Sequence, residues 1–291
     1  MARENTIELF KTYIDQLDDV YKLESISVIL ESNAELIRQG KNAGEFIIPK
    51  IAMDGLADYS RSDGYKTGKV DFSNETVKCD FDRGRIFNID AMDNEETVGI
   101  AFGKLASEFL RTKVVPELDA YRFAKYAGKA GKKEAAALAD GSAVMEAISK
   151  ALLHMDDAEV PEEGRYLFIT PAHLNAIKSL DTTKSRELLA TLEGRIIKVP
   201  QTRFYSTIDL LDGAKSGEEA GGYKKNASAK DLNFMMLHKS ALIQFTKHTV
   251  NKIFSPEENQ KADAWAFHYR SYGIADVLEN KVNGIYVHTA A

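Results

Sequence analysis

The spacing of apolar residues changes at Asp93, and this change limits what the chain can fold into. Before Asp93 apolar and polar side chains alternate, as in a β-strand. After it apolar residues recur every three or four positions, as on one face of a helix. The two sets are Val70, Phe72, Val77, Cys79, Phe81, Phe87 and Ile89, and then Val98, Phe102, Leu105 and Phe109. A β-hairpin joined directly to a long helix suits a part that reaches neighbouring subunits.

Local signals predict the bends and ends of these elements. Residues 62–64, Ser-Asp-Gly, form the expected hairpin tip, because glycine accepts the positive φ angles of turns. We expect the apolar strand residues to share one face that needs a cover. Asp93 is a good N-cap for the helix. Pro116 removes an amide donor, which predicts a kinked helix or two abutting helices, and Gly128 and Gly131 predict the end.

The second half of the chain predicts a compact α/β lobe followed by long strands. Residues 140–200 carry three helical stretches, the third capped by Ser185, and two short strands. Residues 212–229 are rich in Gly, Lys and Ser, which indicates a mobile surface loop. Four strands are expected after it, at residues 232–237, 242–254, 264–277 and 284–288.

The whole-chain numbers exclude some classes of protein. At 291 residues the chain has room for one or two domains, and a hydrophobic fraction of 44% is too high for disorder. The net charge of -6 disfavours free binding to DNA or RNA but not enclosure of nucleic acid. The single cysteine, Cys79, excludes an intramolecular disulfide. No apolar run reaches the roughly 20 residues that span a bilayer, and the charged first ten residues are no signal peptide.

No pattern in the sequence predicts catalysis, a cofactor or a metal, so we expect a protein that is not an enzyme. The glycines near Lys215 lack the order of a phosphate-binding loop. His248 and His268 could meet across two strands and hold a metal, although packed or surface histidines are commoner. Four lysines indicate a solvated helix end, or alternatively a contact with a polyanion. They are Lys125, Lys129, Lys132 and Lys133.

Four stretches of sequence carry a resemblance to a known family. They are DRGRIFNIDAMDNEET at residues 82–97, VVPELDAYR at 114–122, PEEGRYLFITP at 161–171 and VLENKVNGIYVH at 277–288. In this order they resemble parts of the major capsid (head) proteins of tailed bacteriophages. Those parts are the junction of extended loop and spine helix, the second half of that helix, a segment of the axial domain, and the C-terminal strands.

The resemblance implies an α+β fold of the Hong Kong 97 type. Such a fold has an N-terminal arm, an extended β-hairpin loop, a long spine helix with peripheral β-strands, and an α/β axial domain. The expected parts are 1–44, N-terminal arm; 45–90, extended loop; 91–130, spine helix of the peripheral domain; 131–245, axial domain; 246–278, peripheral strands; 279–291, C-terminal strand. The helical pattern of residues 5–38 fits either an arm or a helix packed on its own subunit.

The same resemblance implies a viral structural protein without catalysis. It is expected to self-assemble into hexamers and pentamers of an icosahedral shell that encloses double-stranded DNA of a phage or prophage. Lys66, Lys69, Arg83 and Arg85 become candidate intersubunit contacts, on or near an arm laid across the next subunit. The chain starts close to this arm, which predicts a separate scaffolding protein, together with a portal. The expected location is the virion, assembled in a bacterial cytoplasm without a membrane.

Two alternatives stay open at this stage. One is an encapsulin-type nanocompartment shell of the same fold, which holds cargo enzymes in place of DNA. The other is a soluble α/β enzyme with its site in the lobe of residues 140–200. Packaged DNA or packaged protein would separate the two shells, and a monomer with measurable turnover would indicate the enzyme.

Overall fold

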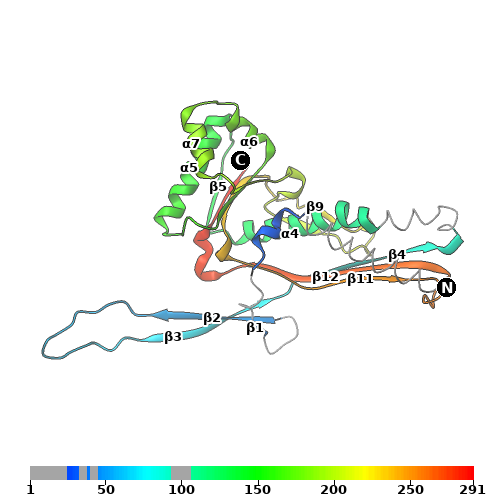
Figure 1. The fold of residues 1–291 in the computed structure, drawn as a ribbon, viewed down its shortest axis with the longest axis horizontal. Coiled ribbons are helices and arrows are strands. Elements are labelled where there is room, and N and C mark those ends of the chain that lie inside the picture. The colour runs from blue at the N-terminus through cyan, green and yellow to red at the C-terminus, as the bar shows by residue number, and fades with distance from the viewer. Residues whose placement is uncertain (1–24, 33–37, 40–44, 93–105) are drawn as a thin grey trace.

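The computed structural model describes residues 25–32, 38–39, 45–92 and 106–291, and within these residues the strands form four sheets (Figure 1). Their strand orders are β5-β13-β10-β6-β7, β11-β12-β4, β1-β2-β3 and β8-β9. The predicted N-cap at Asp93 and the apolar positions Val98, Phe102 and Leu105 lie outside the described residues. Most of the N-terminal helical pattern also lies outside them.

The described elements have the following bounds. The strands are β1 (Arg38–Gln39), β2 (Glu45–Met53), β3 (Val70–Lys78), β4 (Phe81–Asp90), β5 (Lys132–Ala135), β6 (Arg165–Ile169), β7 (Ile196–Lys198), β8 (Ile208–Leu210), β9 (Tyr223–Lys225), β10 (Leu232–His238), β11 (Leu242–Phe254), β12 (Ala264–Val277) and β13 (Ile285–Thr289). The helices and single turns are η1 (Ile26–Leu30), η3 (Leu110–Val114), α4 (Val115–Lys129), α5 (Gly141–Asp157), α6 (Pro171–Lys178), α7 (Thr183–Thr191), η4 (Gln201–Arg203), η5 (Lys239–Ala241) and η6 (Glu279–Gly284).

The five-stranded sheet is the centre of the lobe, between α4 on one side and α5, α6 and α7 on the other. Side chains of β10 alternate between these two layers, as the pleat of a strand requires. Phe234 and Met236 join the cluster under α5 and α6, whereas Met235 and Leu237 join the cluster under α4. All seven residues of β10 are buried, which identifies it as the central strand.

The second sheet, β11-β12-β4, is long and antiparallel, and one of its faces packs on the helical segment before α4. The rings of Phe87 and Phe109 lie 4.7 Å apart and those of Phe109 and Phe267 6.3 Å apart, both in edge-on geometry that aromatic pairs favour. The predicted bounds of the strands at 242–254 and 264–277 are confirmed. The strand predicted at 232–237 is one residue short, and the one predicted at 284–288 lies one residue too early.

The helix passes Pro116 without dividing. The turn just before it, η3, is a π-helix, and Pro116 lies in the first turn of α4. A π turn is wider than an α turn, so it makes room for the proline ring. Its hydrogen bonds also span five residues instead of four, which accommodates the missing amide donor of the proline. The predicted end is confirmed, since α4 ends at Lys129, between Gly128 and Gly131.

Residues 45–78 form the protruding hairpin of β2 and β3, and its predicted tip is confirmed. Residues 61–63 form a turn, Ser60 pairs with Gly64, and Gly64 has a φ of 76°. The sequence placed residues 45–90 together, but β4 pairs with β12 in the second sheet and not with β3. The hairpin therefore ends before Phe81.

Two local predictions in the lobe are corrected. Thr182, not Ser185, is the N-cap of α7, and Ser185 completes a capping box as the third helical residue. The Gly-rich stretch predicted as one loop contains β9, which pairs with β8. Cross-strand pairing ties this segment down, although its composition is that of a loop.

Candidate assembly surface

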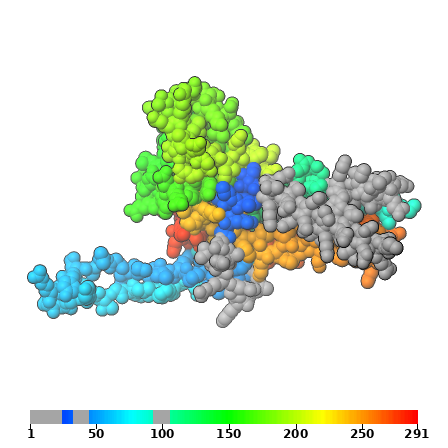
Figure 2. All heavy atoms as spheres, in the orientation of Figure 1, coloured from blue at the N-terminus to red at the C-terminus, as the bar shows by residue number. Residues whose placement is uncertain are grey.

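One face of the hairpin exposes a row of apolar side chains, and Figure 2 shows how far this hairpin stands out from the rest of the molecule. Ile51 lies opposite Phe72, and Met53 lies opposite Val70, so all four share one face. Their exposed fractions are 53%, 75%, 70% and 54%. We call these four residues the arm face.

The opposite face of the hairpin packs on its own chain near the base. Phe46 and Val77 are buried there against Ile243 and Ile274 of the second sheet. Phe72 and Val77 are five residues apart, and an odd separation along a strand places side chains on opposite faces. The prediction of one shared apolar face is therefore wrong: one apolar set covers the base, and the arm face points away from it.

The apolar character continues to the tip. Leu56, Tyr59 and Tyr65 are all exposed, and the two tyrosine rings contact each other at 4.9 Å. An isolated hairpin is marginal in water, and contiguous exposed apolar patches usually mark interaction sites. The hairpin thus has the exposed apolar surface that is typical of a contact element.

Two of the four candidate contact residues lie on this hairpin. Lys66 is exposed next to the tip. Lys69 pairs with Asp71 at 2.8 Å, and its backbone N–H donates to a carboxylate oxygen of Asp54 at 2.8 Å. An intersubunit role for Lys66 and Lys69 stays a prediction.

The other two candidates, Arg83 and Arg85, lie on β4 and contact their own chain. Arg83 donates to Glu117 of α4 at 2.7 Å and to the carbonyl of Gly222 at 3.2 Å. Arg85 donates to the carbonyl of Glu219 at 2.9 Å. The Gly-rich loop thus folds onto the two guanidinium groups, beside a cavity of about 780 Å³. An intersubunit role for these arginines also stays a prediction, and these contacts compete with it.

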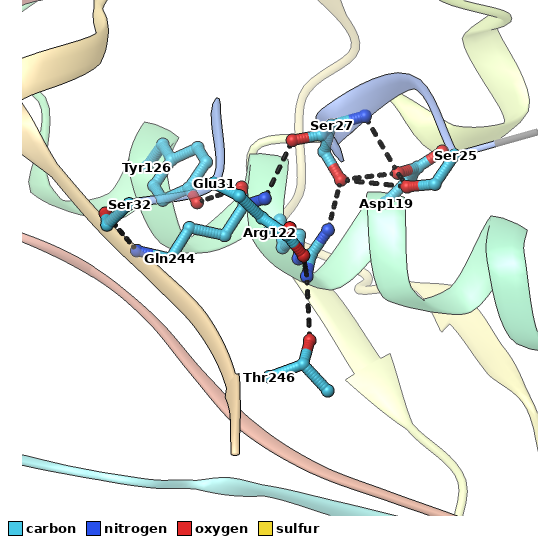
Figure 3. A network of polar contacts seen from close by, with 9 residues as sticks. All are labelled: Ser25, Ser27, Glu31, Ser32, Asp119, Arg122, Tyr126, Gln244 and Thr246. Atoms are coloured by element: carbon cyan, nitrogen blue, oxygen red, sulfur yellow. Dashed lines mark hydrogen bonds and ion pairs between the residues drawn. The ribbon is translucent and has the colours of Figure 1, made fainter. Parts of the chain in front are cut away.

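A buried polar network, which the sequence did not reveal, ties η1 to α4 (Figure 3). Asp119 of α4 is fully buried and accepts hydrogen bonds from the hydroxyls of Ser25 at 2.8 Å and Ser27 at 2.6 Å. The backbone N–H groups of Ile26 and Ser27 donate to the same carboxylate, each at 3.2 Å. Asp119 therefore caps the start of η1, although it comes from a distant part of the chain.

Further members of the network extend it to β11. Gln244 donates to the carbonyl of Ser27 at 2.7 Å, and Tyr126 donates to Gln244 at 2.7 Å. Arg122, also buried, donates to the Ser27 hydroxyl at 2.7 Å. Burial raises the pKa of Tyr126, so its hydroxyl stays a donor. The network fixes residues 25–32 between α4 and β11, next to the point where the hairpin begins.

Comparison with known proteins decides which fold this is. No protein-family model and no curated protein matches the sequence. Solved structures do match. One from Gordonia phage Cozz has a TM-score of 0.61 at 12% identity, covering 91% of this chain and 86% of the other. The capsid structure of Staphylococcus phage Andhra has a TM-score of 0.60 at 11% identity, covering 89% and 84%. This chain has the Hong Kong 97-type capsid fold.

A third match of this fold is the virus-like particle from Pyrococcus furiosus, with a TM-score of 0.57 at 13% identity. It covers 97% of this chain and 99% of the other. The predicted α+β class and the Hong Kong 97-type fold are confirmed. The bounds of the six predicted parts stay predictions, apart from the reassignment of β4 to the second sheet.

The structure also places the histidines and lysines that the sequence singled out in this Hong Kong 97-type chain. His248 pairs with Tyr272 and His268 with Lys252, so the two histidines lie four positions apart along the sheet. The idea that these two meet at a metal is wrong. Lys125 pairs with Asp80, and Lys129 pairs with Asp276 at 2.5 Å, so half of the lysine cluster is neutralised within the chain. No described helix has both the length and the apolarity to cross a bilayer.

Proposed function

We propose that this chain is the major capsid protein of a tailed double-stranded DNA phage or prophage. Copies form hexamers and pentamers, and these close into an icosahedral shell around the genome. The arm face carries the proposal, since it is an exposed apolar surface on a hairpin that leaves its own body. The likeness of the fold to solved phage capsids supports the same conclusion.

The free energy that one arm contact can contribute favours a closed ring over a simple dimer. Fully burying a Val, Ile, Phe or Met side chain contributes about 1.5–3 kcal/mol, so the arm face, already partly covered, contributes roughly 4–8 kcal/mol. Association costs an estimated 4–15 kcal/mol. One arm contact therefore roughly breaks even. A ring in which every subunit both gives and receives an arm closes on itself and makes such contacts cooperative.

The proposal also sets the partners and the location. The chain acts in the virion and encloses DNA without reading its sequence, a role that its net charge of -6 does not disfavour. A separate scaffolding protein and a portal complete assembly in the bacterial cytoplasm. The chain has no catalytic role in this proposal.

One observation favours a second candidate, the shell of a protein compartment. The virus-like particle from Pyrococcus furiosus matches over 97% of this chain and 99% of its own length. In that case the same arm contacts would close a shell around cargo proteins in place of DNA.

Negative-stain electron microscopy of the purified protein, expressed with and without a candidate scaffold, tests the proposal. Closed shells, tubes or capsomer rings are the expected result, and a monodisperse monomer under every condition would contradict it. Nuclease-treated particles from infected or induced host cells are then extracted. Protected DNA supports the virus, and copurifying protein cargo without DNA supports the compartment.

A further inference from the structure

The hairpin meets the rest of its own chain near its base, through contacts of two kinds. The first is the apolar cluster of Phe46 and Val77 against Ile243 and Ile274. The second is ionic and involves Lys50, four residues further along β2. Among the described residues, no hydrogen bond or ion pair joins residues 51–72 to the rest of the chain. Lys50 is therefore the outermost polar tie between the arm and the body.

Lys50 lies between two carboxylates from different elements. Its ammonium is 3.0 Å from Glu75 on the neighbouring strand β3, and it also bonds to Glu279 of η6. The side chain of Lys50 is only 17% exposed and that of Glu75 only 9%. Hydrogen bonds to Glu279 and Glu75 raise the pKa of Lys50, which keeps its charge. Glu75 holds the ammonium within the hairpin, and Glu279 connects it to the body.

Glu279 stands at the joint between the two large sheets. It is the first residue of η6, which connects the end of β12 in the second sheet to β13 in the lobe. Lys281, on the same turn, donates to the carbonyl of Ser240 at 3.2 Å and fastens η6 to the lobe side. The Lys50–Glu279 bond thus links the arm to the segment that joins both sheets.

Two separate contacts along the hairpin fix its direction relative to the body, whereas a single contact would allow it to rotate. Four residues of β-strand span about 13 Å, so the Lys50 contact acts well outside the apolar cluster at Phe46. We propose that Lys50 and Glu279 are positioning residues that set the direction in which the arm leaves the body. Since each arm covers the next copy, they also set the curvature of the shell, an inference that rests on the proposed capsid function.

The first test measures arm direction in the unassembled protein, without any shell. Spin labels at Arg61→Cys on the tip and Glu187→Cys on α7, both exposed positions, report the arm-to-lobe distance in a Cys79→Ser background. Glu279→Gln removes the negative charge that holds Lys50 to the body, leaving at most a neutral hydrogen bond, and keeps the Lys50–Glu75 pair. It is expected to broaden the distance distribution. An unchanged distribution would overturn the proposal.

Lys78→Met is the matched control. Lys78 lies on the same hairpin, but it pairs at 3.4 Å with Glu45 on the neighbouring strand β2, so its ion pair does not reach the body. The control is expected to keep the parent distribution. If Lys78→Met broadens the distribution as much as Glu279→Gln does, the effect is a general loosening of the hairpin and the positioning role is wrong.

The second test measures particle size by electron microscopy. The parent and Lys78→Met are expected to form particles of the same diameters, and Glu279→Gln a broader spread of diameters or open tubes. Identical particles from all three would contradict the curvature part of the proposal. If the parent forms no particles, the capsid function fails, and the distance measurement still decides whether Glu279 directs the arm.

Discussion

Asp119 shows at the scale of one residue how this fold holds its N-terminal segment. Its carboxylate has no exposed surface, yet four donors from residues 25–27 and the guanidinium of Arg203, 3.3 Å away, satisfy it. A buried charge is tolerated only where its hydrogen bonds are complete. An amide in place of the carboxylate turns one of its two acceptor oxygens into a donor, so the donors that it faces lose their acceptor.

We predict that Asp119→Asn destabilises the unassembled protein by about 3 kcal/mol, because the amide places an N–H group among existing donors. Urea unfolding followed by circular dichroism measures the change. Asp181→Asn is the matched control, since Asp181 pairs at 2.6 Å with Arg186 but both side chains are exposed. That control is expected to change stability by less than about 1 kcal/mol. Equal effects of the two substitutions would contradict the role of the network.

A second prediction at the scale of one residue concerns the loss of folding stability in acid. His238 is buried, donates from Nε2 to the carbonyl of Glu163 at 2.8 Å, and accepts at Nδ1 from the hydroxyl of Ser240 at 2.8 Å. A proton on Nδ1 would replace that acceptor with a donor. Burial lowers the pKa of His238, and it lowers the pKa values of His173 and His288 in the same way.

The direction in which stability changes with pH follows from the protons that the folded and unfolded chains bind. The unfolded chain binds a proton at each of these histidines near pH 6.5, and the folded chain binds it only at lower pH. Stability should therefore be nearly constant above about pH 7 and fall as the pH drops from there toward about 5. Thermal unfolding of the unassembled protein at constant ionic strength measures this. A melting temperature that rises with acid across this window would show that the three histidines gain protons on folding.

At the scale of elements, the arm face predicts a separation between folding and assembly. Phe72→Lys places a charge in the middle of this face, where the next subunit is expected to pack. The unassembled protein should unfold within about 0.5 kcal/mol of the parent, because Phe72 is already exposed. Particles should be absent by electron microscopy.

Ala52→Lys is the control for this prediction. Ala52 lies on the same strand pair but on the opposite face, directly across from Asp71, which can pair with the new lysine. Normal particles are expected from it. Normal particles from Phe72→Lys would show that the arm face is not an intersubunit surface.

The elements that sequence predicted well are those whose pattern is complete within a few residues. Strands β11 and β12 are 13 and 14 residues long, carry many β-branched and aromatic residues, and could be placed to the residue. The pairing of β8 with β9 depends on two three-residue strands, which are too short to carry a period. The arm face was misread because Phe72 and Val77 were assigned to one face, although they are an odd number of residues apart on the continuous strand β3.

The candidate site was predictable only in part, because some of its contacts join residues that are far apart in the sequence. The exposed hairpin followed from local alternation and from the turn at residues 62–64. The contacts of Arg83 did not, since its partners Glu117 and Gly222 are 34 and 139 residues away. Asp119 also gave no local signal, because a carboxylate beside buried Leu118 and Ala120 reads as an exposed helix position.

At the scale of the whole molecule, the chain combines a well-packed body with an arm whose outer face is exposed among the described residues. The body has two large sheets joined by η6, and α4 packs against both of them. The arm leaves this body beside the same joint (Figure 1). In the proposed assembly, neighbouring copies would cover the exposed face of the arm.

The most direct test is a cryo-electron microscopy reconstruction of particles assembled from this protein. We predict a closed shell in which Ile51, Met53, Val70 and Phe72 of each subunit are buried against the adjacent subunit. A shell in which these four side chains face solvent, or a protein that never leaves the monomeric state, would contradict the proposal that the hairpin is the assembly element.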